Sequence, residues 1–298
     1  MLEFRTISIE DKDWITACLR ASDYRGCEYS FANNMAWRRL SGSQIARYEG
    51  FYLCTAFETE DGTPSFCYPA GEGDHRSVID VMRRFSAERG QPLVIWNVSE
   101  ERLAWLETQY PGQFSVEENR DSWDYVYRSE DLAELSGRKY HQKRNFLHRF
   151  AEYGAVYAPI TERDFDDCII FAADAYNARL EGDHSGIAEQ FAIDTYFRYF
   201  RELGLQGGTL RLDGKLIAMT VGEPLNSDTF CVHIEKADTA YAGVYAAINQ
   251  QFSAHIREQG FAFINREEDL GLEGLRKAKQ SYHPITMLKK LCVTFTMP

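Results

Sequence analysis

The sequence predicts a mixed α/β (α+β) protein made of two tandem copies of one module, each a mostly antiparallel sheet flanked by helices. The composition of the 298-residue chain, 44% hydrophobic and 26% charged, is that of an ordinary globular protein. Strand and helix patterns alternate in a similar order in both halves. PLVIWNVSEERLAWLE (92–107) and FAFINREEDLGLEGLR (261–276) match in kind: an apolar strand, an asparagine, an acidic loop and a helix. The alternative is that this succession occurs by chance, because it is common in α/β proteins.

The first module is predicted to span residues 1–128. Apolar residues recur every three or four positions in its helices, and Ser99 is a suitable N-cap for one of them. The expected helices are 8–21, 71–90 and 99–110, and the expected strands are 44–50, 51–58, 65–70, 92–97, 114–118 and 124–129.

The second module is predicted to span residues 129–298. Asp213-Gly214 between two apolar runs indicates a hairpin over 207–222. The order of elements differs from a Rossmann fold and from a barrel, and it is similar to the mixed sheet of GNAT acyltransferases. The expected helices are 162–180, 187–203, 239–260 and one after residue 265, and the remaining strands are 228–237, 261–265 and 285–296.

Charge and cysteine content restrict the possible partners. The formal net charge of −12 disfavours general binding to DNA or to anionic membranes. The seven cysteines are odd in number, widely spaced and without a CxxC, which indicates free thiols and no metal site. The sequence shows no signal-peptide pattern and no run of roughly 18 apolar residues, so we expect a cytoplasmic protein without integral membrane contact.

Three segments carry a resemblance to a known family. NREEDLGLEGLRKAKQSYHP (265–284) resembles the most characteristic motif of the phosphatidylglycerol lysyltransferase C-terminal domain family, and SGRKYHQKRNFLHRF (136–150) and HIEKADTAYAGVYAAINQQF (233–252) agree in the expected order. The resemblance extends over nearly the whole chain. It implies two tandem GNAT-like domains, with the chemistry in the second and a degenerate first copy.

The resemblance also implies a reaction class. Lysyl- and alanyl-phosphatidylglycerol synthases and Fem-type peptidoglycan aminoacyltransferases share the double fold. They move an aminoacyl group from a charged tRNA to an amine or hydroxyl, whereas ordinary GNAT enzymes use acyl-CoA. Because this sequence shows no membrane-helix pattern, unlike the lipid synthases, a lipid acceptor is not expected.

The strand 228–237 supplies the catalytic candidates. Alternation along it places Cys231, His233 and Glu235 on one face. The corresponding strand of GNAT enzymes lines the acyl site, which implies Glu235 and His233 as general bases for the amine proton. Tyr282 stands where many GNAT enzymes place the acid that protonates the leaving thiolate. The alternative is that the three strand residues form the solvated face of a half-buried strand.

The donor is expected at the start of helix 239–260, in the place of the GNAT pyrophosphate loop. Amides at a helix N-terminus bind anions, although the usual leading Arg or Gln is missing here. The donor is acyl-CoA or coenzyme A, alternatively aminoacyl-tRNA. Without phosphate binding this would be a plain helix start. The predicted cofactor residues are Asp238, Thr239, Ala240, Tyr241, Ala242 and Gly243, together with Arg276 and Lys279 on a later helix face.

Two polar segments are predicted to hold the acceptor. The acidic loop offers Asn265, Arg266, Glu267, Glu268 and Asp269, and its carboxylates suit a substrate ammonium. The alternative is an internal salt-bridge network. The basic segment 136–150 suits phosphate or an RNA backbone, or is simply a solvated helix. Its predicted substrate residues are Lys143, Arg144 and Asn145.

These observations predict a transferase that moves an acyl or aminoacyl group to an amine or hydroxyl of a small molecule or peptide. A charged tRNA is the alternative donor and a candidate partner. The alternative is a non-catalytic GNAT-derived module that binds a metabolite or a protein. A base and an acid near the acyl site, Glu235 and Tyr282, favour the enzyme.

Overall fold

The computed structural model describes residues 2–55, 65–177 and 184–297, so the ends of the predicted strand 51–58 and helix 162–180 lie outside the described residues. The chain divides into two compact units. The first comprises Met1–Asp124, Glu268–Leu272 and Met287–Pro298, and the second comprises Tyr125–Glu267 and Glu273–Thr286. The predicted boundary between residues 128 and 129 stays a prediction.

The first unit contains two four-stranded sheets, ordered β1-β2-β3-β5 and β4-β6-β15-β7. Strands β4 and β6 pair in parallel, and helices α3 and α4 contribute Met82 and Leu106 to the shared core. The elements are β1 (Arg5–Thr6), α1 (Lys12–Ser22), α2 (Phe31–Ser41), β2 (Gln44–Tyr48), β3 (Phe51–Cys54), β4 (Ser65–Cys67), β5 (Ala70–Gly71), α3 (His75–Ala87), β6 (Val94–Val98), α4 (Glu100–Gln109), β7 (Phe114–Glu118) and β15 (Leu291–Phe295).

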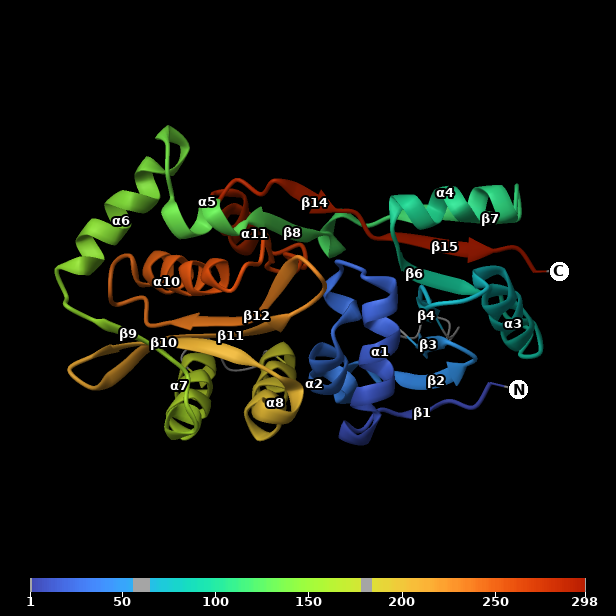
Figure 1. The fold of residues 1–298 in the computed structure, drawn as a ribbon, viewed down its shortest axis with the longest axis horizontal. Helices are drawn as coiled ribbons and strands as arrows, with labels where there is room; N and C mark the ends of the chain where they lie inside the picture. The colour runs from blue at the N-terminus through green and yellow to red at the C-terminus, as the bar shows by residue number, and fades with distance from the viewer. Residues whose placement is uncertain (1, 56–64, 178–183, 298) are drawn as a thin grey trace. The chain divides into compact units, whose positions relative to one another are not determined.

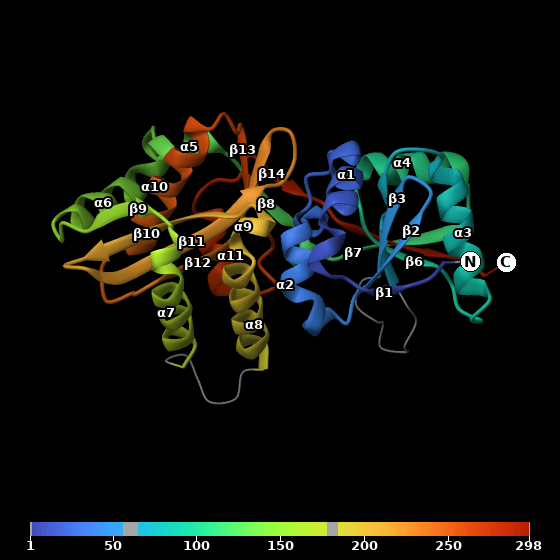
Figure 2. The same ribbon diagram turned by 60° about the horizontal axis from the view of Figure 1, so that its bottom comes forward.

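The second unit is built on a sheet ordered β14-β8-β13-β12-β11-β10-β9. Helix α10 covers one face of the sheet, and α7 and α8 stand side by side on the other (Figures 1 and 2). The elements are β8 (Asp124–Arg128), α5 (Ser129–Glu134), α6 (His141–Ala151), β9 (Val156–Pro159), α7 (Phe165–Asn177), α8 (His184–Arg198), α9 (Phe200–Leu203), β10 (Gln206–Leu212), β11 (Lys215–Pro224), β12 (Thr229–Ala237), α10 (Val244–Glu258), β13 (Phe263–Asn265), α11 (Glu273–Gln280) and β14 (Thr286–Leu288).

The mixed α/β class predicted from the sequence is confirmed, with parallel pairs β4–β6 and β12–β13 among antiparallel neighbours. The Asp213-Gly214 hairpin is also as predicted. Both residues have positive φ angles, 49° and 83°, as a two-residue hairpin turn of this kind requires.

Two terminal strands differ from the prediction. Residues 124–129 were expected to close the first half, but β8 pairs with β13 of the second unit. The expected single strand 285–296 divides into β14 and β15, and β15 inserts between β6 and β7 of the first unit. Apolar alternation does not distinguish the sheets, because a buried strand shows the same pattern in either one.

Two helices also differ. Helix α2 was not expected, because its two asparagines weaken the helical pattern. Ser30 is its N-cap, and the Ser30 side chain accepts a hydrogen bond from the Asn33 amide. Helix α10 begins at Val244 rather than at residue 239, since residues 238–243 form a separate loop. No helix in the described part of the chain is long and apolar enough to cross a bilayer.

Candidate active site in the second unit

The site is built where two parallel strands separate. Strands β12 and β13 pair over only three residues and end at Cys231↔Asn265. Asn265 is buried, and its Oδ1 accepts a hydrogen bond of 2.7 Å from the Glu267 amide. Glu267 takes a left-handed conformation, with φ 58°. The chain therefore turns out of the sheet after Asn265, while β12 continues to Ala237 along β11.

A β-bulge lies in β12 at the level of this separation. Val221 pairs with Ile234 and Gly222 pairs with Val232, so His233 is an extra residue on its strand. A bulge interrupts the alternation of side chains between the two faces.

The bulge overturns the predicted shared face of His233 and Glu235. The His233 ring stacks on Tyr196 of α8, with ring centroids 5.4 Å apart. Glu235 Oε2 instead accepts a hydrogen bond from Asn249 of α10 at 3.3 Å. Because α8 and α10 cover opposite faces of the sheet (Figures 1 and 2), the two predicted bases cannot act together on one substrate.

A polar cluster lies on the α10 face. Arg266 Nη2 donates to Glu235 Oε1 at 2.9 Å, and both side chains are 12% exposed. The guanidinium carbon of Arg266 lies 5.2 Å from the ring centroid of Tyr282. Arg266 Nη1 and Asn249 Oδ1 are buried and make no hydrogen bond within the described part of the protein. Buried polar atoms are normally satisfied, so these two indicate a position for substrate groups.

A cavity of about 210 Å³ adjoins this cluster through Tyr282. Lys143 Nζ lies 3.7 Å from the Tyr282 ring centroid and donates to Ser281 Oγ at 2.6 Å. Burial and the positive charge of Arg266 lower the pKa of Lys143 to about 8. Burial raises the pKa of Tyr282, so its phenol keeps its proton at neutral pH. The lining residues are Lys143, Phe146, Thr239, Tyr241, Ala242, Gly243, Val244, Tyr245, Ala246 and Tyr282.

The N-terminus of α10 forms one wall of the cavity. Gly243 is its N-cap, with φ 90° and no side-chain cap. A Cβ at this position would overlap the backbone carbonyl of Phe146, so the loop packs closely on α6. The first amides of a helix have no partner within the helix, which gives this wall a positive potential. Two residues of the predicted donor loop, Asp238 and Ala240, do not line the cavity. The Asp238 carboxylate instead accepts a hydrogen bond from the Ala240 amide.

The acidic loop does not gather into one ammonium site. Glu267 Oε1 contacts His233 Nδ1 at 2.8 Å. Glu268 lies 3.6 Å from Lys290, and the fully buried Asp269 lies 3.4 Å from Arg120. Each carboxylate thus has a different partner, as in the salt-bridge alternative. The reason is that the chain passes from the second unit to the first between residues 267 and 268.

The other predicted contacts are also distributed differently. The ammonium of Lys279 is buried and donates to the carbonyl oxygens of Arg266, at 2.6 Å, and Glu267, at 3.2 Å. Arg144 donates to two backbone carbonyls before α6, and Asn145 is exposed beside His141. These three residues, and Arg276, are not among the lining of the cavity.

The sequence did not point to Asn249 or Tyr127. Tyr127 lies with its ring 5.9 Å from the Arg266 guanidinium, and its hydroxyl donates to the Lys279 carbonyl at 2.8 Å. Asn249 is a buried polar residue between Ile248 and Phe252 of α10. The sequence did contain one signal that could have identified Asn249: it is an asparagine on the apolar stripe of an amphipathic helix.

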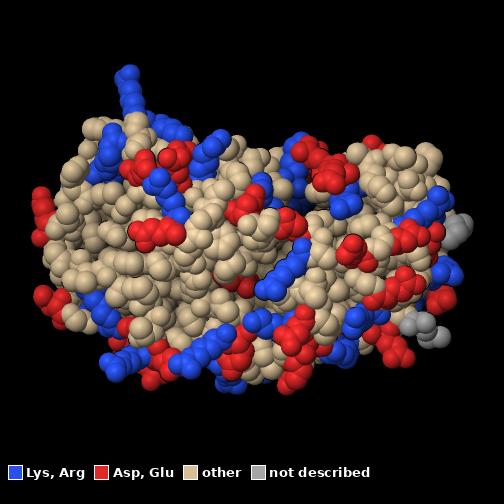
Figure 3. All heavy atoms as spheres, in the orientation of Figure 1, with Lys and Arg blue, Asp and Glu red and all other residues tan. Residues whose placement is uncertain are grey.

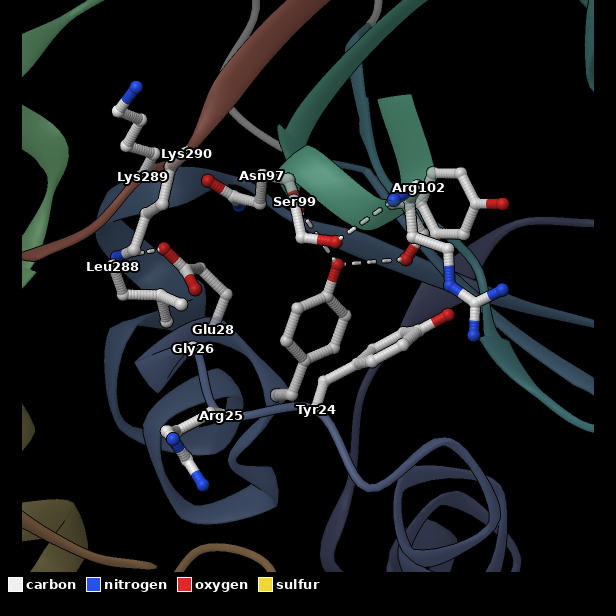
Figure 4. A pocket seen from close by; sticks show the side chains of 12 residues that line it. Tyr24, Arg25, Gly26, Glu28, Asn97, Ser99, Arg102, Leu288, Lys289 and Lys290 are labelled. Carbon is white, nitrogen blue, oxygen red and sulfur yellow. Dashed lines mark hydrogen bonds and ion pairs between the residues drawn. The ribbon is translucent and has the colours of Figure 1, made fainter. Parts of the chain in front are cut away.

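The first unit has a smaller cavity, of about 50 Å³. Glu28 and Lys290 point toward one another there and form an ion pair (Figure 4). Burial raises the pKa of Glu28, and the neighbouring Lys290 ammonium opposes the shift. Arg102, Tyr24 and Tyr68 form another part of the wall.

Comparison with solved structures defines the class of protein. The structure matches the C-terminal domain of a putative lysylphosphatidylglycerol synthetase from Agrobacterium fabrum with a TM-score of 0.68 and 14% identity, over 96% of this chain and 92% of that one. The two chains therefore share one mixed α/β fold, in agreement with the predicted fold class. A conserved protein of unknown function from Bacteroides thetaiotaomicron is 37% identical, with a TM-score of 0.92 over 99% of this chain and 100% of the other.

Sequence comparison then gives the family. Residues 19–294 match the family described as phosphatidylglycerol lysyltransferase, C-terminal. The chain belongs to this family. An uncharacterized protein of Mycoplasmoides gallisepticum is 26% identical over 211 residues, which span 68% of this chain and 65% of that relative's length. Family and fold support an acyl- or aminoacyltransferase in general.

Proposed function

We propose that the chain transfers an acyl or aminoacyl group to an amine, at the α10 face of the second unit. The observation that supports this most directly is the pair of unsatisfied buried atoms beside Glu235, Arg266 Nη1 and Asn249 Oδ1. One is a donor and the other an acceptor, and the reaction needs both. An acyl carbonyl oxygen accepts hydrogen bonds, and an attacking amine donates them.

Each residue then has a definite part. The amine nitrogen attacks the acyl carbon, and Glu235 takes the proton that the nitrogen loses. Asn249 Oδ1 accepts a second N–H of the amine, and Arg266 Nη1 donates to the carbonyl oxygen as negative charge develops on it. The new C–N bond forms as the C–S bond of a thioester, or the C–O bond of an aminoacyl ester, breaks. Tyr282 gives its proton to the leaving sulfur or oxygen.

The donor phosphate is proposed to bind at the cavity next to Tyr282. Lys143 supplies a cation and the first amides of α10 supply hydrogen-bond donors to the lining of this cavity. Acidic and basic side chains are intermixed over the face drawn in Figure 3, so this binding depends on the local lining rather than on a broad basic surface. Coenzyme A and the tRNA 3′ end both carry suitable phosphates. The net charge favours the smaller donor, and the family resemblance favours aminoacyl-tRNA.

The first experiment measures donor binding and turnover together. Coenzyme A, acetyl-CoA and aminoacyl-tRNA are titrated calorimetrically, and donor consumption is followed with a panel of amines. We expect saturable binding of one donor class and amine-dependent consumption. Absence of binding for every donor would overturn the donor site. Binding without turnover would identify a non-catalytic ligand-binding module.

The variant Tyr282→Phe tests the proposed acid. No hydrogen bond of the Tyr282 hydroxyl is recorded among residues 2–55, 65–177 and 184–297, so removing it should leave stability and donor affinity unchanged. Turnover should fall by about 10²–10⁴-fold. Tyr153→Phe, at an exposed tyrosine of the same unit, is the control and should have no effect. Full activity of Tyr282→Phe would remove this residue from the mechanism.

A further inference from the structure

The opposite face of β12 carries a second cluster that acyl transfer does not use. Cys231 Sγ, His233 Nδ1 and a Glu267 carboxylate oxygen lie within 4.8 Å of one another. The closest contacts are 2.8 Å from His233 Nδ1 to Glu267 Oε1 and 3.8 Å from Cys231 Sγ to the same oxygen. The His233 side chain is 1% exposed, and Cys231 is fully buried.

We propose that Cys231, His233 and Glu267 bind a zinc ion. Thiolate, imidazole and carboxylate are the donors that Zn²⁺ prefers, at about 2.0–2.3 Å, and three protein ligands leave a fourth position for water. The proposal is independent of acyl transfer, because it concerns the α8 face rather than the α10 face.

The surroundings of His233 support a metal ligand. Its Nε2 faces Glu223 Oε1 at 3.3 Å, while Nδ1 faces the shared centre. Metal-bound histidines commonly donate their other N–H to a carboxylate, which fixes the tautomer and the ring orientation. Tyr196 stacks on the ring at an interplanar angle of 10° and further restricts its rotation.

Charge balance also permits the ion. Binding displaces the thiol proton of Cys231, so the thiolate and the Glu267 carboxylate supply two negative charges for the two positive charges of Zn²⁺. Glu267 is the most accessible ligand, with a side chain 20% exposed, and it gives the ion an entry path.

The first unit contains a similar group of ligand atoms that differs from the proposed zinc site in its surroundings. Cys27, Asp124 and Glu268 also offer ligand atoms within 4.8 Å of one another. There the ammonium of Lys290 lies 2.6 Å from Asp124 and 3.4 Å from Cys27 Sγ. That group already contains its cation, the Lys290 ammonium, whereas the His233 ring faces two carboxylates, Glu267 and Glu223, and stacks on Tyr196.

The ion would join β12 to the turn that follows β13. By holding Glu267, it fixes the backbone of Arg266, whose guanidinium faces Glu235 on the other side of the sheet. The zinc ion would therefore act as a positioning element for the separated strands.

The test uses the full chain, stripped of metal with a chelator and titrated with Zn²⁺ against a chromophoric competitor, and with Co²⁺ by absorption. We expect one equivalent of each ion and a thiolate-to-cobalt charge-transfer band. Cys231→Ser should abolish that band, and Glu223→Gln should weaken zinc binding by about 10–100-fold. Cys168→Ser, at a buried thiol outside the cluster, should leave the band unchanged.

The wild-type chain alone decides the main question, so the result does not depend on how well the variants fold. A folded chain that shows no stoichiometric zinc and no thiolate-to-cobalt band overturns the proposal. A band that persists in Cys231→Ser also overturns it. Since none of these readouts involves a donor or an amine, failure here would leave the proposed transfer unaffected.

Discussion

Glu235 is held on two sides, by the guanidinium of Arg266 and by the side-chain amide of Asn249. Glu235 is therefore part of the packing of this face as well as the candidate base. Arg266 and Glu235 are both only 12% exposed, so the loss of one charge leaves the other largely desolvated.

Glu235→Gln should therefore affect both turnover and stability. We expect turnover to fall by about 10²–10⁴-fold because the general base is lost. The free energy of unfolding should fall by about 1–3 kcal/mol because a charged hydrogen bond is lost. Donor consumption and chemical denaturation measure the two effects. Glu152→Gln, at an exposed position of the same unit, is the control. Unchanged turnover in Glu235→Gln would assign the ion pair a structural role only.

Lys143 predicts a pH dependence of donor binding. Its pKa is lowered to about 8 by burial and by Arg266, so the ammonium loses its charge as the pH rises through about 8. Donor affinity should be highest below this value and should decrease by roughly tenfold above it, as one charged contact is lost. Calorimetry between pH 6.5 and 9.5, in steps of about half a unit around the pKa, measures the curve. Lys143→Met should give weaker binding without the step. Wild-type affinity that does not change with pH would place the phosphate elsewhere.

At the scale of elements, the approach of α6 to the start of α10 creates the cavity. The contact is possible only because Gly243 has no side chain, since a Cβ would overlap the Phe146 carbonyl. The φ of 90° is also unfavourable for any other residue.

Gly243→Ala should open this junction. We expect the free energy of unfolding to fall by about 1–3 kcal/mol from backbone strain alone, with weaker donor binding because the amides move. Gly274→Ala is a matched control. Gly274 lies in α11 with no atom near its missing Cβ, so the same substitution should stabilise the helix by up to about 1 kcal/mol. Melting temperatures that shift equally in both variants would contradict the close packing at Gly243.

At the scale of the whole chain, the last strand of each half of the sequence completes the sheet of the other unit. Strand β15 pairs with β7 on one side and with β6 on the other, and so joins β7 to the sheet. Strand β8 lies between β13 and β14. Each unit therefore depends on a strand that lies outside its own half of the sequence.

Fragments cut at the predicted boundary test this dependence. Residues 1–128 lack β15, and residues 129–298 lack β8. We expect neither fragment to show a cooperative thermal transition by circular dichroism when expressed alone. Co-expression should recover a folded pair, because each fragment carries the strand that the other lacks. A cooperative transition in either isolated fragment would show that the exchanged strand is dispensable.

Part of the candidate site could be predicted from short segments of the sequence. Four residues of the predicted donor loop 238–243, all but Asp238 and Ala240, line the cavity. Tyr282, the predicted acid, and Lys143, which was expected to bind the substrate, line it as well, although all these roles stay predictions. Local signals were sufficient there because a loop before a helix and a basic helix are features of short segments. The faces of His233 and Glu235 were wrong, because the bulge depends on how β12 pairs with β11, far along the chain.

By itself the sequence determined the class of fold, the hairpin at Asp213-Gly214 and the segments that mark the family, because each depends on short-range pattern and turn chemistry. Only the tertiary structure decided which sheet β8 and β15 join, which carboxylate of the acidic loop meets which cation, and which polar atoms are left unsatisfied beside Glu235. These features depend on pairing between residues that are distant in the chain, and such pairing has no periodicity in the sequence.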